Sequence, residues 1–225
     1  LFGAWINIII EDINNQDYVA ANRELSRMQT TARHLKNDFG IMRSYSLLGD
    51  MYFQQGIHYM AYFQYKKALN YGLSCGENDL LRPYSDIAQA CIAMRRWNEA
   101  ETNLLQSITY SKDLYTLLSP YISLLKLYCI EDTIDSNKIE QSFQRLQNTR
   151  NSIALLGNRQ DNYNLAMYYY YQFYKNDSVT AQKYWSQGNA VDSFAYYKYR
   201  GQYFETRKNY MAACDNYYSY SDYYY

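Results

Sequence analysis

The sequence predicts an all-α solenoid of about six antiparallel helix pairs. The 225 residues include 9 Gly and 2 Pro, fewer than the many tight turns of a sheet protein of this size usually require. Hydrophobic residues make up 48% of the chain and charged residues 20%, which is typical of a globular protein and not of a disordered one. An internal repeat of 39 residues predicts that the helices are stacked in similar units.

The repeat is clearest in two neighbouring units. In each, a small residue on the expected first helix lies 12 residues before an alanine on the expected second helix, and the two pairs are Gly49 with Ala61 and Ala88 with Ala100. Small residues there allow the paired helices to approach closely, while large residues fill the gaps beside them. The large residues of the first unit are Tyr45, Tyr52 and Tyr65. Gly56 is expected in the turn between the helices, where a left-handed backbone is convenient.

The motifs Tyr45-x2-Leu48-Gly49-x2-Tyr52 and Ala61-x3-Tyr65-x2-Ala68 resemble the tetratricopeptide repeat. That family has a large residue, then Leu-Gly, then Tyr on its first helix, with Ala and Phe on its second. The resemblance implies a right-handed superhelix with a concave face lined by first helices. Because the family's usual period is about 34 residues, we expect second helices about one turn longer, or longer loops.

The other units match the pattern in part. Trp5 and Ala21 fit a first pair, and Pro120 precedes a fourth first helix as Pro83 precedes the third. Proline is favourable at a helix start because its missing N–H would be unpaired there. In the fifth unit Tyr169 departs from the motif, and Arg200 does so in the sixth. The sequence predicts one domain with approximate repeats at 1–38, 39–78, 79–116, 117–158, 159–192 and 193–225.

Charge and hydropathy argue against two classes of partner. The 22 Lys and Arg balance the 22 Asp and Glu, whereas a nucleic-acid-binding protein normally has a basic excess. The longest apolar stretch, residues 1–10, is too short to cross a bilayer and is predicted to be the first helix; the alternative is that it follows a membrane segment further upstream. Because the chain begins with Leu and has no helix stop signal at its end, we expect it to be part of a longer protein.

No sequence motif indicates catalysis, a metal or a cofactor. The two histidines, His34 and His58, have no ligand spacing, and there is no phosphate-binding glycine loop or nucleophile elbow. The four cysteines include no C-x-x-C pair. Cys91, Cys129 and Cys214 lie in apolar patterns and are expected to be buried, whereas Cys75 is expected in a loop. The sequence therefore predicts that this chain is not an enzyme.

Residues of the first helices that are not used for packing are the candidate binding residues. An aromatic set in the fifth unit suggests an exposed face, and the alternative is that these rings pack against neighbouring helices. Tyrosine is concentrated in the same part of the chain, with 18 of the 30 from Tyr163 onward. The predicted concave-face residues are Arg43, Ser46, Asp50, Phe53, Arg82, Ser85, Gln89, Lys126, Tyr163, Tyr170, Phe173, Tyr174, Lys198 and Gln202.

Two functions of different classes fit these features. The first is a scaffold that binds a protein or peptide in the concave groove. The second is suggested by a resemblance to the tyrosine-rich sensor regions of bacterial sensor kinases and DNA-binding regulators, which implies a ligand-sensing domain of a membrane-anchored signalling protein. That second function would place the chain in the periplasm, and otherwise it is expected in the cytoplasm. A weaker alternative is carbohydrate binding through tyrosines. An uncapped apolar end also suggests homodimerisation through the C-terminal end.

Overall fold

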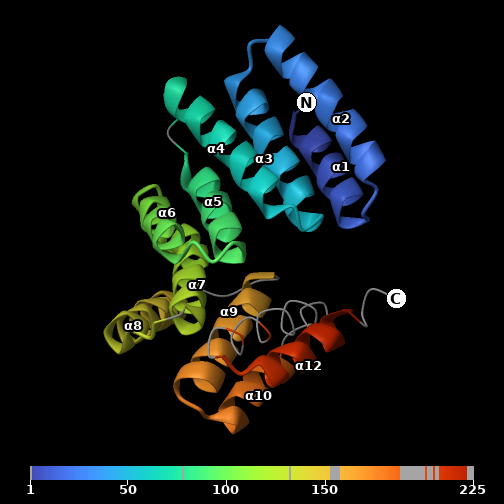
Figure 1. Cartoon of the computed structure of the whole chain (residues 1–225). Coiled ribbons are helices and arrows are strands. Elements are labelled where there is room, and N and C mark those ends of the chain that lie inside the picture. The colour runs from blue at the N-terminus through green and yellow to red at the C-terminus, as the bar shows by residue number, and fades with distance from the viewer. Residues whose placement is uncertain are drawn as a thin grey trace. The chain divides into compact units, whose positions relative to one another are not determined.

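The computed structural model of the chain describes residues 2–77, 79–131, 133–152, 158–187, 201, 205 and 208–221. These residues form eleven α-helices and one π-helical segment, and no strand occurs among them. The helices pack in consecutive antiparallel pairs (Figure 1), which confirms the predicted all-α architecture of stacked helix pairs. The chain divides into two compact units, Leu1–Ser111 (unit 1) and Lys112–Tyr225 (unit 2).

Unit 1 contains three helix pairs. Each pair has a first helix and a second helix joined by a turn of three residues. The pairs are α1 (Phe2–Asn14) with α2 (Tyr18–His34), α3 (Asp38–Gln54) with α4 (His58–Ser74), and α5 (Leu81–Ala93) with α6 (Trp97–Thr109).

The turn between α3 and α4 has the left-handed residue that the sequence predicts. Gly56 has a φ of 74°, and the next residue, Ile57, donates its N–H to the carbonyl of Tyr52 at 2.9 Å. This backward bond pairs a carbonyl that the end of the helix would otherwise leave open. The helix therefore stops within one turn, and the chain can reverse into α4.

Close approach of α3 and α4 depends on Gly49. A methyl group on its Cα would lie 2.3 Å from the ring of Tyr65 on α4, which is far inside van der Waals contact. Ala61 and Ala68 on the facing helix are fully buried. The structure thus confirms that small residues at these motif positions set the distance between the paired helices.

Both expected sources of the long repeat are present. The second helix α4 has 17 residues, compared with 13 in α6. The connection from α4 to α5 spans residues 75–80, whereas residues 35–37 join α2 to α3. The extra residues of the 39-residue period therefore lie partly in a longer helix and partly in a longer loop.

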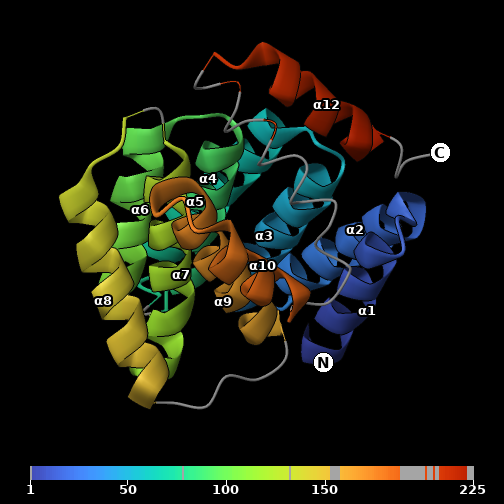
Figure 2. The same cartoon turned by 90° about the horizontal axis from the view of Figure 1, so that it is seen from below.

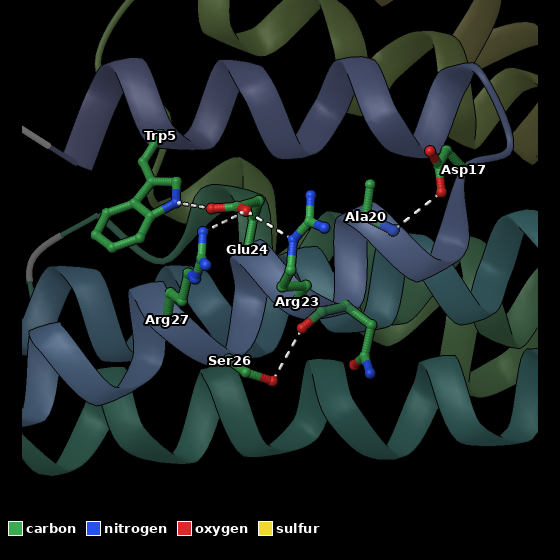
Figure 3. A network of polar contacts seen from close by, with 8 residues as sticks. Trp5, Asp17, Ala20, Arg23, Glu24, Ser26 and Arg27 are labelled. Carbon is green, nitrogen blue, oxygen red and sulfur yellow. Dashed lines mark hydrogen bonds and ion pairs between the residues drawn. The ribbon is translucent and has the colours of Figure 1, made fainter.

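A polar network joins α1 to α2 at the surface of unit 1. Figure 3 shows Trp5 of α1 and two arginines of α2 converging on Glu24. The indole Nε1–H donates to Glu24 at 3.2 Å, and Arg23 and Arg27 pair with the same carboxylate at 3.1 and 3.0 Å. The bond from Trp5, followed by that from Arg23, lowers the pKa of Glu24. Below the network, Ile9, Ala21 and Met28 belong to the core of this pair.

Among its described residues, unit 2 has two further helix pairs and one additional helix. In the first pair, α7 and α8 run side by side (Figure 2). In the second pair, a first helix that is α-helical and then π-helical packs against α10. The elements are α7 (Leu114–Ile130), α8 (Ser136–Ser152), α9 (Asn158–Tyr169), η1 (Tyr170–Tyr174), α10 (Ser178–Ser186) and α12 (Tyr210–Ser221).

The start of α7 corrects the prediction for Pro120. The helix begins at Leu114 and contains Pro120 in its interior. The signal for the true start is a capping box, in which the Asp113 side chain accepts from the N–H of Thr116 at 2.7 Å and the Asp113 N–H donates to the Thr116 hydroxyl at 3.2 Å. This reciprocal pairing satisfies the first open N–H groups, so the helix starts there although an interior proline removes one hydrogen bond.

Candidate functional site

A pocket of about 320 Å³ lies along the first helices of the three pairs of unit 1. Helix α3 contacts both α1 and α5, and α4 adds one side chain. The lining has an apolar part, called the apolar wall, and a part with amides and charges, called the polar wall. The lining residues are Ile10, Ile13 and Phe53 on the apolar side, and Asn14, Asp50, Gln54, Tyr65 and Arg82 on the polar side.

The polar wall is built around the carboxylate of Asp50. The Tyr65 hydroxyl donates to its Oδ1 at 3.0 Å, and Arg82 donates from Nη2 to its Oδ2 at 3.1 Å. The Nε of Arg82 also lies 3.5 Å from Asp86 Oδ2. The Arg82 side chain is half exposed, so its guanidinium pairs with both carboxylates and still borders the pocket.

Two further charges lie behind this wall. Arg43 is 8% exposed, and its Nη1 makes no hydrogen bond within the described structure. Burial, and then the charge of Arg82, lowers the pKa of Arg43. Burial followed by the charge of Asp50 raises the pKa of Asp86 to about 7, against the opposing effect of the two arginines. The site therefore has two cations and two carboxyl groups, and the pKa of one carboxyl group, that of Asp86, is raised to about 7.

Three of the predicted binding residues meet in this pocket. Asp50 and Phe53 come from α3 and Arg82 comes from α5. Both are first helices of their pairs, on which the binding residues were expected. Ser85 and Gln89 lie half-buried on α5. Lys126, also predicted, is half-buried on α7 of unit 2 and belongs to a different unit.

Arg43 and Ser46 were expected on an open face, but the structure buries both of them. The reason is that α3 contacts α1, α2, α4 and α5. A helix with neighbours on this many sides has no broad free face, and only its C-terminal end, around Asp50 and Phe53, opens into the pocket.

The predicted aromatic face of the fifth unit corresponds to core in the structure. Tyr163, Tyr170 and Phe173 are all at most 6% exposed, so the packed alternative applies to these three rings. Tyr170 stacks on Phe143 with ring centroids 4.1 Å apart and donates its hydroxyl to Glu140 at 3.0 Å. The burial follows from contacts of α9 and η1 with α7 and α10.

Tyr174 is the member of that set that stays half-buried. The ammonium of Lys175 lies 4.7 Å from the centre of its ring and also pairs with Glu140. The last two predicted residues, Lys198 and Gln202, lie outside the described residues.

The sequence reasoning missed Asp86 and the contribution of α1. Asp86 is four residues after Arg82, and this i,i+4 spacing is the signal that two opposite charges share a helix face. Ile10, Ile13 and Asn14 gave no comparable signal, because the pattern of one helix does not show which neighbouring helix it approaches. Their place in the pocket follows from the contact between α1 and α3.

In the part of the chain that the structure describes, no group of three or more His, Cys, Asp or Glu is placed to hold a metal ion. Among the same residues, no helix combines the length and the apolar character needed to cross a membrane.

Comparison with known proteins supports the fold. The sequence matches no protein-family model and no curated protein sequence significantly. Among solved structures, the chain is similar to BtubC (BKLC) from P. vanneervenii, with a TM-score of 0.67 and 17% sequence identity. The match covers 81% of this chain and 76% of BtubC. At this level of identity the likeness shows a shared helical fold.

Proposed function

We propose that this chain is a binding module without catalytic activity of its own, and that it holds a peptide or a segment of a partner protein in the pocket of unit 1. The observation that supports the proposal is the pocket itself. It lies along three successive first helices and combines an apolar wall with a wall of fixed charges. Binding sites typically have this combination, because apolar contact supplies affinity and a few polar groups fix orientation.

The size of the pocket indicates how much of a partner enters it. At about 320 Å³, it is at the small end of ligand pockets, so it fits an anchoring group better than a whole helix. In many interfaces one or two buried anchors supply most of the binding energy. The neighbouring surface would then contact the rest of the partner more weakly.

A peptide library displayed on phage tests the proposal. Peptides selected on the wild-type protein are assayed on Phe53→Ala, which removes the aromatic part of the apolar wall. The matched control is Phe39→Ala, since Phe39 lies on the same helix and is about half exposed but does not line the pocket. We expect Phe53→Ala to weaken binding by about tenfold or more and Phe39→Ala to leave it unchanged. Equal binding to all three proteins would show that the pocket is not the binding site.

A second candidate function is a ligand-sensing domain of a bacterial membrane-anchored signalling protein. The observation in its favour is the paired charge of Asp50 and Arg82 beside apolar residues, which is suited to a small polar ligand. The reading frame on both sides of this segment tests it. A membrane helix followed by a kinase or DNA-binding module would support the sensor, and a frame without either would argue against it.

Carbohydrate binding, the weaker alternative, would have to use tyrosine rings other than Tyr163 and Tyr170, because these two are packed in the core of unit 2.

A further inference from the structure

The polar wall of the pocket presents one acceptor and one donor next to each other. Asp50 uses each carboxylate oxygen in one hydrogen bond, to Tyr65 and to Arg82. A carboxylate has about four lone-pair positions, so Asp50 can accept further bonds. Arg82 has five N–H donors, its side chain is half exposed, and it lines the pocket. The wall can therefore bind a cation and an anion at once.

The two binding positions lie very close together. The Nη2 of Arg82 and the Oδ2 of Asp50 are 3.1 Å apart, so the ligand groups that they attract must also be neighbours. A ligand with a positive and a negative group on the same carbon atom satisfies this condition. A ligand with a single charge would be attracted by one of these two side chains and repelled by the other. Because the two charges are so close together, the attraction and the repulsion largely cancel.

The apolar wall completes the requirement. Ile10, Ile13 and Phe53 line the same pocket as the charged groups. Contact with these side chains favours a ligand with an aliphatic or aromatic group, because that group leaves water on binding. The amides of Asn14 and Gln54 also line the pocket, and each can both donate and accept hydrogen bonds.

We infer that this pocket binds a free α-amino acid with an apolar side chain. Its carboxylate bonds to Arg82, its ammonium bonds to Asp50, and its side chain packs on Ile10, Ile13 and Phe53. The inference rests on the proposal that this pocket is the binding site, and it gives the sensor function a ligand class. A pocket of about 320 Å³ is at the low end of the range for small-molecule sites, in keeping with a ligand of this size.

Two neighbouring side chains, Asp86 and Tyr65, hold the pair in place. Arg82 also contacts Asp86, and Tyr65, which is 3% exposed, holds Asp50 from α4. Because Asp50 and Arg82 are fixed before the ligand arrives, binding does not require these two side chains to be ordered.

Calorimetric titration and thermal shift with L-leucine, L-isoleucine and L-phenylalanine test the inference on the full chain. Two analogues of leucine serve as controls: 4-methylpentanoate lacks the ammonium group, and 3-methylbutylamine lacks the carboxylate. We expect at least one amino acid to raise Tm in a concentration-dependent way and both analogues to bind at least about tenfold more weakly. Analogues that bind as tightly as leucine would overturn the inference.

Variants locate the ligand in the pocket. Asp50→Asn and Arg82→Gln each remove one charge and are expected to weaken binding by at least about tenfold. The matched control is Asp38→Asn on the same helix, since Asp38 also accepts a tyrosine hydroxyl, from Tyr71 at 2.9 Å. It is expected to bind like the wild type. Unchanged binding by Asp50→Asn and Arg82→Gln would overturn the inference.

A further variant tests the pocket without changing its charges, in case Asp50→Asn or Arg82→Gln fails to fold. Ile10→Trp enlarges a partly buried residue of the apolar wall, fills the pocket and leaves its charges intact, so it should abolish amino-acid binding while the circular dichroism stays helical. If no amino acid binds to the wild type but selected peptides do, and Phe53→Ala weakens them, the inference fails and the proposed function stands. If neither binds at the pocket, both fail.

Discussion

Left-handed residues at the helix ends let neighbouring helices reverse direction within a few residues. Among the described residues, Gly56 and Gly76 have positive φ, and so do five residues that are not glycine: Gln16, Lys36, Arg95, Asn176 and Lys208. After Lys36, as after Gly56, the following N–H bonds to a carbonyl of the preceding helix, from Asn37 to Ala32 at 2.8 Å. Residues with a Cβ have less favourable energy in this conformation, so these turns contain local strain.

The first prediction uses this strain at Lys36 and Gly56. Lys36→Gly should stabilise the protein by about 0.5–1 kcal/mol, because glycine adopts the left-handed conformation without the Cβ penalty. Gly56→Ala should destabilise it by about 1 kcal/mol, and space is not the cause, since a Cβ there would meet nothing within 4 Å. Urea denaturation followed by circular dichroism measures both changes. Lys36→Ala is the control, and a gain of stability in that variant would assign the effect to the lysine side chain instead.

The second prediction concerns Asp86 and pH. Its pKa is raised in the folded protein to about 7 by burial and by Asp50, compared with about 3.9 for an unfolded aspartate. The folded state therefore binds this proton more tightly than the unfolded state. The stability that Asp86 contributes is fully present below about pH 4 and is lost as the pH rises toward 7. An upper limit for this loss is about 4 kcal/mol.

Asp86→Asn should remove this loss, because asparagine does not titrate. We expect the free energy of unfolding of the wild type to fall further between pH 5 and pH 8 than that of Asp86→Asn. Carboxylates with lowered pKa, such as Glu140 and Asp177, act in the opposite direction, but they are the same in both proteins and cancel in the comparison. Parallel stability curves for the two proteins would show that Asp86 is already ionised at pH 5.

At the scale of helices, the third prediction concerns the contact between α3 and α4. Gly49 faces Tyr65, and the positions 39 residues further on are Ala88 and Leu104, both fully buried. Compared with Gly49 and Tyr65, the next repeat has a larger residue on its first helix and a smaller residue on its second helix. Gly49→Ala should destabilise by about 1–3 kcal/mol through overpacking, and Tyr65→Leu by a few kcal/mol through the cavity that it leaves.

The double variant Gly49→Ala/Tyr65→Leu recreates the residue pair of the next repeat. We expect it to be more stable than the sum of the single changes predicts, by about 0.5–3 kcal/mol. Gly3→Ala is the control, because a Cβ at Gly3 meets nothing within 4 Å and alanine is the better helix residue. Strict additivity in the double-mutant cycle would mean that the two positions do not compete for the same space.

The positions of the helices could be predicted from these small residues, because a Gly or Ala in a fixed register forces a close helix contact wherever it recurs. Which faces the neighbouring helices would cover could not be predicted. Arg43 lies on the same helix as Asp50, yet it is buried because α3 contacts four other helices. Periodicity along one helix contains no information about the number of its neighbours. The predicted binding residues therefore include the three pocket residues Asp50, Phe53 and Arg82 and also residues that neighbouring helices bury.

Local signals also competed at the start of α7. Proline favours a helix start, and Pro120 was predicted to precede one, but the Asp113–Thr116 capping box starts the helix at Leu114, six residues before Pro120. At Tyr169, the last residue of α9, the sequence departs from the repeat motif. The structure has a π-helical segment directly after it, and Tyr169 is fully buried. A π-turn changes the register of the side chains, which a motif with a constant period cannot represent.

At the scale of the whole molecule, each compact unit has one buried and one exposed thiol. Cys91 is buried in unit 1 and Cys129 in unit 2, as expected, while Cys75 is exposed in its loop. Cys214 was predicted to be buried but is exposed on α12, because its place in an apolar pattern did not fix which side of the helix is covered. Burial, and then the charge of Glu99, raises the pKa of Cys91 to about 12, and burial raises the pKa of Cys129 as well.

The fourth prediction follows from this distribution of thiols. With a thiol reagent at neutral pH, Cys75 and Cys214 should react quickly, because they are accessible and the thiolate is the reactive form. Cys91 and Cys129 should react only as fast as their surroundings open. Mass spectrometry of the labelled peptides identifies each site. Fast labelling of Cys91 or Cys129 in the native protein would contradict their burial.

The slow thiols also show whether destabilisation in one unit reaches the other. In a repeat protein each unit is stabilised mainly by its immediate neighbours, so a change within the α3–α4 pair should act most strongly nearby. Gly49→Ala is therefore expected to speed the labelling of Cys91 by a larger factor than that of Cys129. A destabilisation of about 1.4 kcal/mol corresponds to a tenfold faster rate if labelling occurs from the opened state. If both thiols accelerate equally, the two units unfold as one cooperative structure, and their separate cores do not behave as separate folding units.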